Sequence, residues 1–196
     1  PTAKQTSFIW NNREGTLRMR NVFAACVTIL FSLPCFASDS LMSKEQVNVW
    51  YSETGWSVGC NFIPSTAINQ LEMWQKDTYD PNTIDRELDW AQDIGFNTVR
   101  VYLHYLVWQE DPNDFKGRMD DFLGICAKHK IKVMFVLFDD CWDGNAKLGK
   151  QPAPKPGVHN SGWLQCPRYA EVNDVTKYPV FEQYVEDILR SFGKDK

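Results

Sequence analysis

The sequence has little excess charge of either sign and no basic stripe. Its 196 residues include 21 Lys and Arg against 25 Asp and Glu, a formal net charge of -4. Proteins that bind nucleic acid usually concentrate positive charge on one face, so an uncharged polymer or a small molecule is the more suitable partner. The composition, 43% hydrophobic and 23% charged, is typical of a globular chain with one domain of ordinary size. The cysteine spacings match no zinc-binding pattern.

The N-terminal apolar run is too short to span a membrane. It covers Val22–Leu33, whereas a bilayer-spanning helix needs about 20 residues. Arg18 and Arg20 precede the run, and small residues lead up to a possible cut after Ala37. A basic flank, a short apolar core and a small-residue site are typical of a secretory signal peptide. We therefore predict a signal peptide at residues 19–37 and a secreted or periplasmic protein, with a buried core helix as the alternative.

The predicted signal peptide sets the other boundaries. Residues 1–18 are interpreted as an upstream or unprocessed extension, residues 38–54 as a polar lead without a strong period, and residues 55–196 as the domain proper. In an oxidising compartment Cys141 and Cys166, which flank a long polar loop, could form a disulfide. The alternative is that both are free buried thiols.

Strand and helix signals alternate along the domain. Strands are predicted in "WSVGCNFIP", "NTVRVYL" and "IKVMFVLFDD". Helices are predicted from Pro81, where Asp80 is the cap, from about Arg118, and around Phe181–Phe192. This order predicts an α/β fold with a parallel sheet whose strands are covered on both faces. A barrel is favoured over a doubly wound sheet because no Gly-rich phosphate turn follows the first strand.

The loops after the strands carry the candidate site, because parallel strands present their ligand contacts at their C-terminal ends. Asp139, Asp140 and Asp143 follow the third strand. These carboxylates could accept sugar hydroxyls, bind a cation, do acid–base work or only cap turns. Four tryptophans are predicted in post-strand loops and would suit stacking on pyranose rings: Trp74, Trp108, Trp142 and Trp163.

Arg100 and His104 belong to the second strand and its following loop. A guanidinium in a strand covered on both faces needs carboxylate partners. Arg100 could therefore hold a catalytic carboxylate or form a purely structural ion pair. His104 suits a binding cleft, with a satisfied surface histidine as the alternative.

Four stretches carry a family resemblance: "GWSVGCNFIPS", "DWAQDIGFNTVRVYLHYLVWQEDP", "FLGICAKHKIKVMFVLFDDCW" and "GWLQCPRY". They resemble the opening third of secreted bacterial (β/α)8 glycoside hydrolases, similar to family 5 cellulases and mannanases. The resemblance implies the first three β/α units of the barrel and a retaining β-glycosidase that needs no metal or cofactor. It implies that Arg100 orients the nucleophilic glutamate. The substrate pocket that it implies contains Asn61, His104, Trp108, Asp139 and Trp142.

The sequence departs from that family in its glutamates. The acid/base and nucleophile are expected after later strands, and no glutamate here follows a strand in an "NE" context. We therefore expect both beyond Lys196 and expect the chain alone to be an inactive fragment. Two other functions stay open. One is a non-catalytic glycan-binding protein that uses the same tryptophans. The other is a cation-dependent phosphohydrolase built on Asp139, Asp140 and Asp143.

Overall fold

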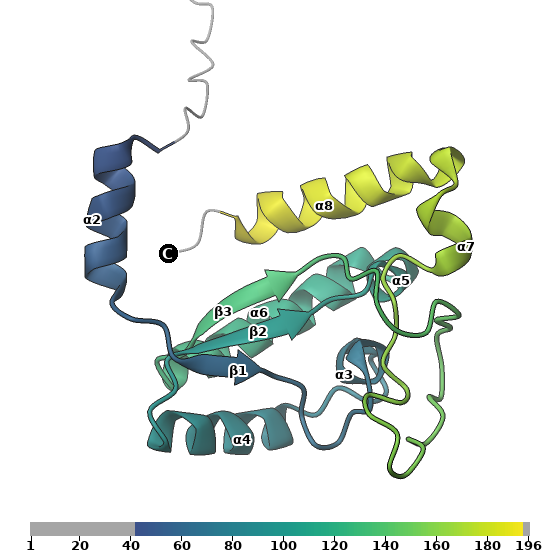
Figure 1. Ribbon diagram of the computed structural model, residues 1–196, viewed down its shortest axis with the longest axis horizontal. Coiled ribbons are helices and arrows are strands. Elements are labelled where there is room, and N and C mark those ends of the chain that lie inside the picture. The colour runs from purple at the N-terminus through teal and green to yellow at the C-terminus, as the bar shows by residue number, and fades with distance from the viewer. Residues whose placement is uncertain (1–41, 194–196) are drawn as a thin grey trace, which may run out of the picture. The chain divides into compact units, whose positions relative to one another are not determined.

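The computed structural model describes residues 42–193, so the predicted extension and signal peptide lie outside the described residues. A parallel sheet of three strands forms the centre of the unit Thr54–Lys196. Its strands are β1 (Gly59–Asn61), β2 (Thr98–Tyr102) and β3 (Lys132–Val136), which lie side by side in chain order (Figure 1). Helices follow the strands and connect them, so the predicted mixed α/β fold with a parallel sheet is confirmed.

Helix α4 (Pro81–Asp93) connects β1 to β2 and begins where the sequence predicts. The Asp80 side chain accepts a hydrogen bond from the Thr83 N–H at 3.1 Å. Pro81 occupies the first turn, where a missing N–H costs nothing. Gly95, at a φ of 93°, follows the helix in the left-handed conformation that glycine adopts without strain.

Helix α6 (Pro112–Lys128) connects β2 to β3 and starts earlier than predicted. Its cap is Asp111, whose carboxylate accepts the N–H groups of Asn113 and Asp114, each at 3.1 Å. The segment before it, predicted as a loop, is the short helix α5 (Tyr105–Glu110). The predicted start near Arg118 is therefore wrong, because the Asp-Pro pair at 111–112 already initiates the helix.

The remaining helical segments precede α4 or follow β3. Helix α3 (Gln70–Trp74) follows β1. Helix α7 (Tyr169–Val172), a 3-10 turn (Val175–Lys177) and helix α8 (Tyr178–Phe192) end the described chain, and α8 confirms the predicted last helix. Most of the separate unit Pro1–Glu53 is not described, but it contributes to helix α2 (Lys44–Thr54), which has no buried residues. The segment predicted as an irregular polar lead is thus partly helical.

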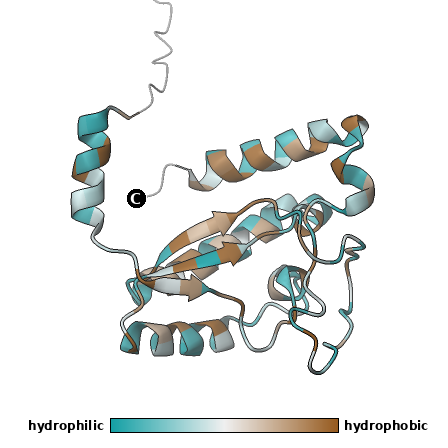
Figure 2. Ribbon diagram, in the orientation of Figure 1, coloured by the Kyte–Doolittle hydropathy of each residue, from teal (hydrophilic) through white to brown (hydrophobic). Residues whose placement is uncertain are grey.

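The core lies on one face of the sheet. Val99 and Val101 of β2 pack there with Ile84 and Leu88 of α4 and Phe122 of α6. Helices α4 and α6 also contact each other. Although β3 is mostly hydrophobic in colour (Figure 2), each of its residues is either exposed or only partly buried.

The opposite face of the sheet is open in the described residues. Arg100 of β2 is exposed, and its register partner Met134 of β3 is 60% exposed. Within residues 42–193 the predicted coverage of these strands is therefore found on one face only. Strands in the order β1-β2-β3 with crossovers of one hand carry their connecting helices on the same face, so α4 and α6 cover one side only.

Candidate functional site

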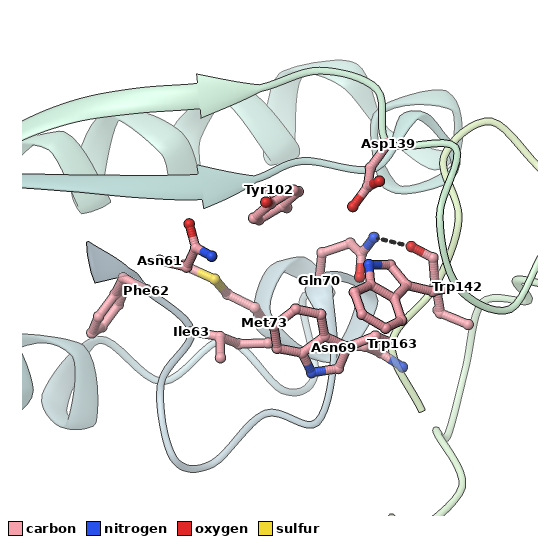
Figure 3. A pocket seen from close by; sticks show the side chains of 11 residues that line it. Asn61, Phe62, Ile63, Asn69, Gln70, Met73, Tyr102, Asp139, Trp142 and Trp163 are labelled. Carbon is pink, nitrogen blue, oxygen red and sulfur yellow. Dashed lines mark hydrogen bonds between the residues drawn. The ribbon is translucent and has the colours of Figure 1, made fainter. Parts of the chain in front are cut away.

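A groove lies at the C-terminal ends of the three strands (Figure 3). The cavity within it measures about 50 Å³, much less than the roughly 300–1,000 Å³ of a typical ligand pocket. We refer to this small cavity and the residues around it as the groove. Its lining residues are Asn61, Phe62, Ile63, Asn69, Gln70, Met73, Tyr102, Asp139, Trp142, Trp163 and Leu164.

The strands bring together polar side chains from three separate parts of the chain. Asn61 is the last residue of β1, Tyr102 is the last residue of β2, and Asp139 follows β3 shortly after its end. Parallel strands end at the same edge of a sheet, so residues far apart in sequence meet there. Asn61 and Asp139 therefore lie together in the groove, and their binding of a substrate stays a prediction.

Two tryptophans form the aromatic part of the groove. The ring centroids of Trp142 and Trp163 are 5.3 Å apart and their planes meet at 75°. Trp142 is 44% exposed, and His159 approaches it edge-on at 6.2 Å. The two indoles therefore form a corner, in which one plane is nearly perpendicular to the other.

The loop that carries Trp142 is paired with the segment 163–166. Asp139 and Cys166 exchange two backbone hydrogen bonds of 2.7 and 2.8 Å. Further along, the Asp143 N–H donates to the Trp163 carbonyl at 3.2 Å, and the Gln165 N–H donates to the Asp143 carbonyl at 2.9 Å. These bonds hold the two groove tryptophans together without regular secondary structure.

Amide side chains at helix α3 attach the long loop to the domain. Asn69 donates to Gln151 at 3.0 Å and to the Gly162 carbonyl at 2.9 Å, and Gln70 donates to the Leu164 carbonyl at 2.7 Å. The sequence analysis did not single out these residues. The available signal was the asparagine directly before "QLEMW", since asparagine is a typical helix cap.

Two of the four predicted stacking residues lie in the core. Trp74 is fully buried and its indole N–H donates to the Tyr102 carbonyl at 2.9 Å. Trp108 is buried in α5, packs against Tyr184, and donates to Asp187 at 2.8 Å. The predicted glycan-stacking role of Trp74 and Trp108 is thus wrong, because both indoles fill space between elements and have no free face. Trp142 and Trp163 do line the groove.

His104 also lies below the surface. It is 0% exposed and caps α5, and it contacts the backbone of Leu106 and of Gln165. The proposed contact of His104 with a ligand is therefore corrected: no part of its ring reaches the groove. Burial lowers the pKa of His104 to about 4, and the nearby positive charge of Arg168 acts in the same direction.

Arg100 lies next to the groove and does not line it. Its guanidinium donates to the Tyr102 hydroxyl and its register partner on β1 is Asn61. Within residues 42–193 no carboxylate forms an ion pair with it. In the described residues the Arg100 side chain is exposed rather than buried, and its role in orienting a glutamate stays a prediction.

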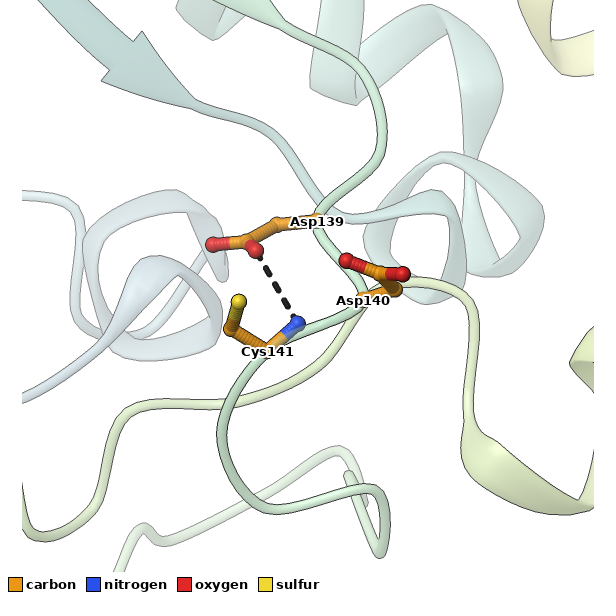
Figure 4. Close-up of side chains that lie close together, drawn as sticks. All are labelled: Asp139, Asp140 and Cys141. Carbon is orange, nitrogen blue, oxygen red and sulfur yellow. Dashed lines mark hydrogen bonds between the residues drawn. The ribbon is translucent and has the colours of Figure 1, made fainter.

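The acidic residues after β3 form a small cluster, but not the predicted one. Ligand atoms of Asp139, Asp140 and Cys141 lie within 4.8 Å of one another (Figure 4). The carboxylate of Asp143 is not part of this cluster and accepts two hydrogen bonds of 2.9 Å from Asn145. The negative charge of Asp139 raises the pKa of the Cys141 thiol, so at neutral pH it is protonated and a poor metal ligand. Nothing else in the described residues marks the cluster as a cation site.

Cys141 and Cys166 are both free thiols, so the predicted disulfide is wrong, and the alternative of free buried thiols holds in full for Cys166 only. Cys166 is buried and faces the Leu137 carbonyl at 3.5 Å, whereas Cys141 is exposed.

Glu171 is the one buried glutamate among the described residues. It accepts hydrogen bonds from Arg168 and from the Tyr105 hydroxyl, and Arg168 lowers its pKa. It does not line the groove, where Asp139 is the single carboxylate among the described lining residues.

Comparison with known proteins adds no relative. No family model matches the sequence, and neither curated proteins nor solved structures give a match. Among residues 42–193, every helix is too short or too polar to cross a bilayer.

Proposed function

We propose that this chain binds a glycan in the groove, as part of a retaining β-glycoside hydrolase that acts on β-linked plant or microbial polysaccharide. The observation that carries the proposal is the corner formed by Trp142 and Trp163 beside the amide of Asn61 and the carboxylate of Asp139. An indole plane suits the C–H face of a pyranose ring, and amides and carboxylates suit its hydroxyl groups.

The finer fold belongs to the same proposal: the three β/α units are the opening arc of a (β/α)8 barrel. Three features support it. The strands are parallel and in sequential order, the crossover helices cover one face, and the groove lies at the C-terminal edge. The resemblance of the sequence to family 5 glycoside hydrolases points the same way.

The proposed reaction needs more than the groove offers. Retaining hydrolysis uses two carboxylates about 5–5.5 Å apart, and Asp139 is the single carboxylate of the described lining residues. We infer that the acid/base and the nucleophile are not among these residues. This chain alone is expected to bind a β-linked oligosaccharide without hydrolysing it.

The experiment is a calorimetric titration with cello-, manno- and xylo-oligosaccharides. Trp142→Ala and Trp163→Ala should each weaken binding about fivefold, since an aromatic contact is worth about 1 kcal/mol beyond its area. Trp90→Ala is the matched control, because Trp90 is 57% exposed on α4 and does not line the groove.

Two outcomes would contradict the proposal. One is the absence of binding to any of the three oligosaccharide series. The other is an equal loss of affinity in the Trp90 control. Chelator-sensitive release of phosphate from a phosphate monoester would instead support the cation-dependent phosphohydrolase.

A further inference from the structure

The His104 ring joins the end of β2 to the segment that carries Trp163, and both of its nitrogens are engaged. The Leu106 N–H donates to Nδ1 at 3.2 Å, and Nε2 lies 3.1 Å from the Gln165 carbonyl oxygen. A backbone N–H can only donate and a carbonyl can only accept. The ring is therefore neutral, with its one proton on Nε2.

The Gln165 contact supports one side of the groove. Gln165 lies between Leu164, which lines the groove, and Cys166, which pairs with Asp139. The Gln165 N–H is bonded to the Asp143 carbonyl, and Asp143 in turn is bonded to Trp163. Movement of Gln165 would therefore disturb both loops that carry the groove tryptophans.

We propose that protonation of His104 in acid opens the groove: a proton on Nδ1 breaks the contact of the ring with Gln165 and so releases segment 163–166. We call this pH-sensitive contact the latch. Such a proton would point at the Leu106 N–H, so two donors would face each other and the helix cap would be lost. The ring would have to leave its site, and the bond to Gln165 would break with it. The consequence for ligand binding rests on the proposed function, whereas the latch itself does not.

The groups around the ring do not neutralise a positive charge on His104 in addition to that of Arg168. Tyr105 stacks on the ring at 5.4 Å, and Arg168 and Glu171 act on it electrostatically. The carboxylate of Glu171 is already bonded to both Arg168 and Tyr105. A charged His104 would thus share one carboxylate with an arginine in a buried site.

The direction of the pH effect follows from the burial of the ring. In the closed form the His104 ring is buried and bonded to Gln165, and in the open form the ring is in water. Burial lowers the pKa of His104 to about 4 in the closed form, against an ordinary value of about 6.5 for the solvated ring of the open form. The closed form binds fewer protons than the open form, so it is favoured above pH 6.5 and loses its advantage as the pH falls toward 4. From these two pKa values, the open population should rise about 100-fold between pH 7 and pH 4.

Cysteine labelling measures this opening without any glycan. A dipyridyl disulfide, which stays reactive toward thiols in acid, is applied to the whole chain between pH 7 and pH 4. Cys141 is exposed and serves as the reference. Cys126 is a buried core residue of α6 and reports global unfolding. The labelling rate of Cys166, relative to Cys141, should rise about 100-fold while Cys126 stays protected.

The control variant is His104→Asn, because asparagine caps a helix as well as the ring does and does not titrate. Cys166 labelling in this variant should not change with pH. An unchanged rate in the wild type, a joint rise of Cys126 and Cys166, or a wild-type response in the variant would each overturn the latch. If the variant does not fold, the comparison of Cys126 with Cys166 in the wild type still tests whether segment 163–166 opens locally in acid. Failure of oligosaccharide binding at pH 7 would count against the proposed function and leave the latch intact.

Discussion

Asn69 performs two tasks with one side chain, and substitution can separate them. Its carbonyl oxygen accepts the N–H groups of Leu71 and Glu72, both at 3.0 Å, and so caps α3. Its amide nitrogen donates to Gln151 and to the Gly162 carbonyl, and so holds the long loop. The residue is almost fully buried, so water replaces neither set of bonds in the folded protein.

The magnitudes follow from these bonds. A lost cap costs about 1 kcal/mol, and each lost donor bond costs about 1 kcal/mol. Asn69→Ala should therefore lower the free energy of unfolding by about 3 kcal/mol. Asn69→Ser keeps a capping oxygen but has no amide, so it should cost about 2 kcal/mol.

Urea unfolding followed by circular dichroism measures both variants. The difference between Ala and Ser isolates the cap, and the difference between Ser and wild type isolates the loop attachment. Equal stability of Ser and wild type would refute the role of the amide in holding the loop. Equal stability of Ala and Ser would refute the capping role.

Three further predictions concern the sheet and the cysteines. Gly59→Ala should destabilise the protein by about 3 kcal/mol or more in thermal unfolding, because the new Cβ would lie 1.7 Å from the Thr98 carbonyl oxygen; an unchanged melting temperature would refute this. Trp74→Phe should cost about 1–3 kcal/mol in urea unfolding, because the last carbonyl of β2 loses its buried donor. Alkylation of the denatured, unreduced protein should label both Cys141 and Cys166, whereas a pair of unlabelled cysteines would show a disulfide.

Local signals predicted the elements whose limits are set by a few neighbouring residues. The cap and proline at Asp80 and Pro81 predicted the start of α4, and the same pair at Asp111 and Pro112 starts α6. The second pair was included in the loop that was predicted after the second strand. The start of α6 was therefore predictable from the sequence, although it was predicted too late.

The burial of individual tryptophans was not predictable in the same way. Trp74 and Trp108 lie in helices too short to show a hydrophobic period, and their burial depends on distant partners. Trp74 packs edge-on against Phe115 and Phe122 of α6, and Trp108 packs against Tyr184 of α8. The sequence pattern predicts that a tryptophan follows a strand, but it does not predict whether the indole points into the core or toward the groove.

Arg100 shows how one assumption about coverage changes a chemical conclusion. A buried guanidinium needs a carboxylate, and the apolar run of β3 suggested that both faces of the sheet were covered. In residues 42–193 the helices cover one face, and Arg100 donates to the Tyr102 hydroxyl beside Asn61. In these residues water solvates the guanidinium, for which the sequence analysis predicted a carboxylate partner. The same residue discriminates between architectures: a closed barrel must bring an acidic group to that face, whereas an open sheet leaves the guanidinium in water.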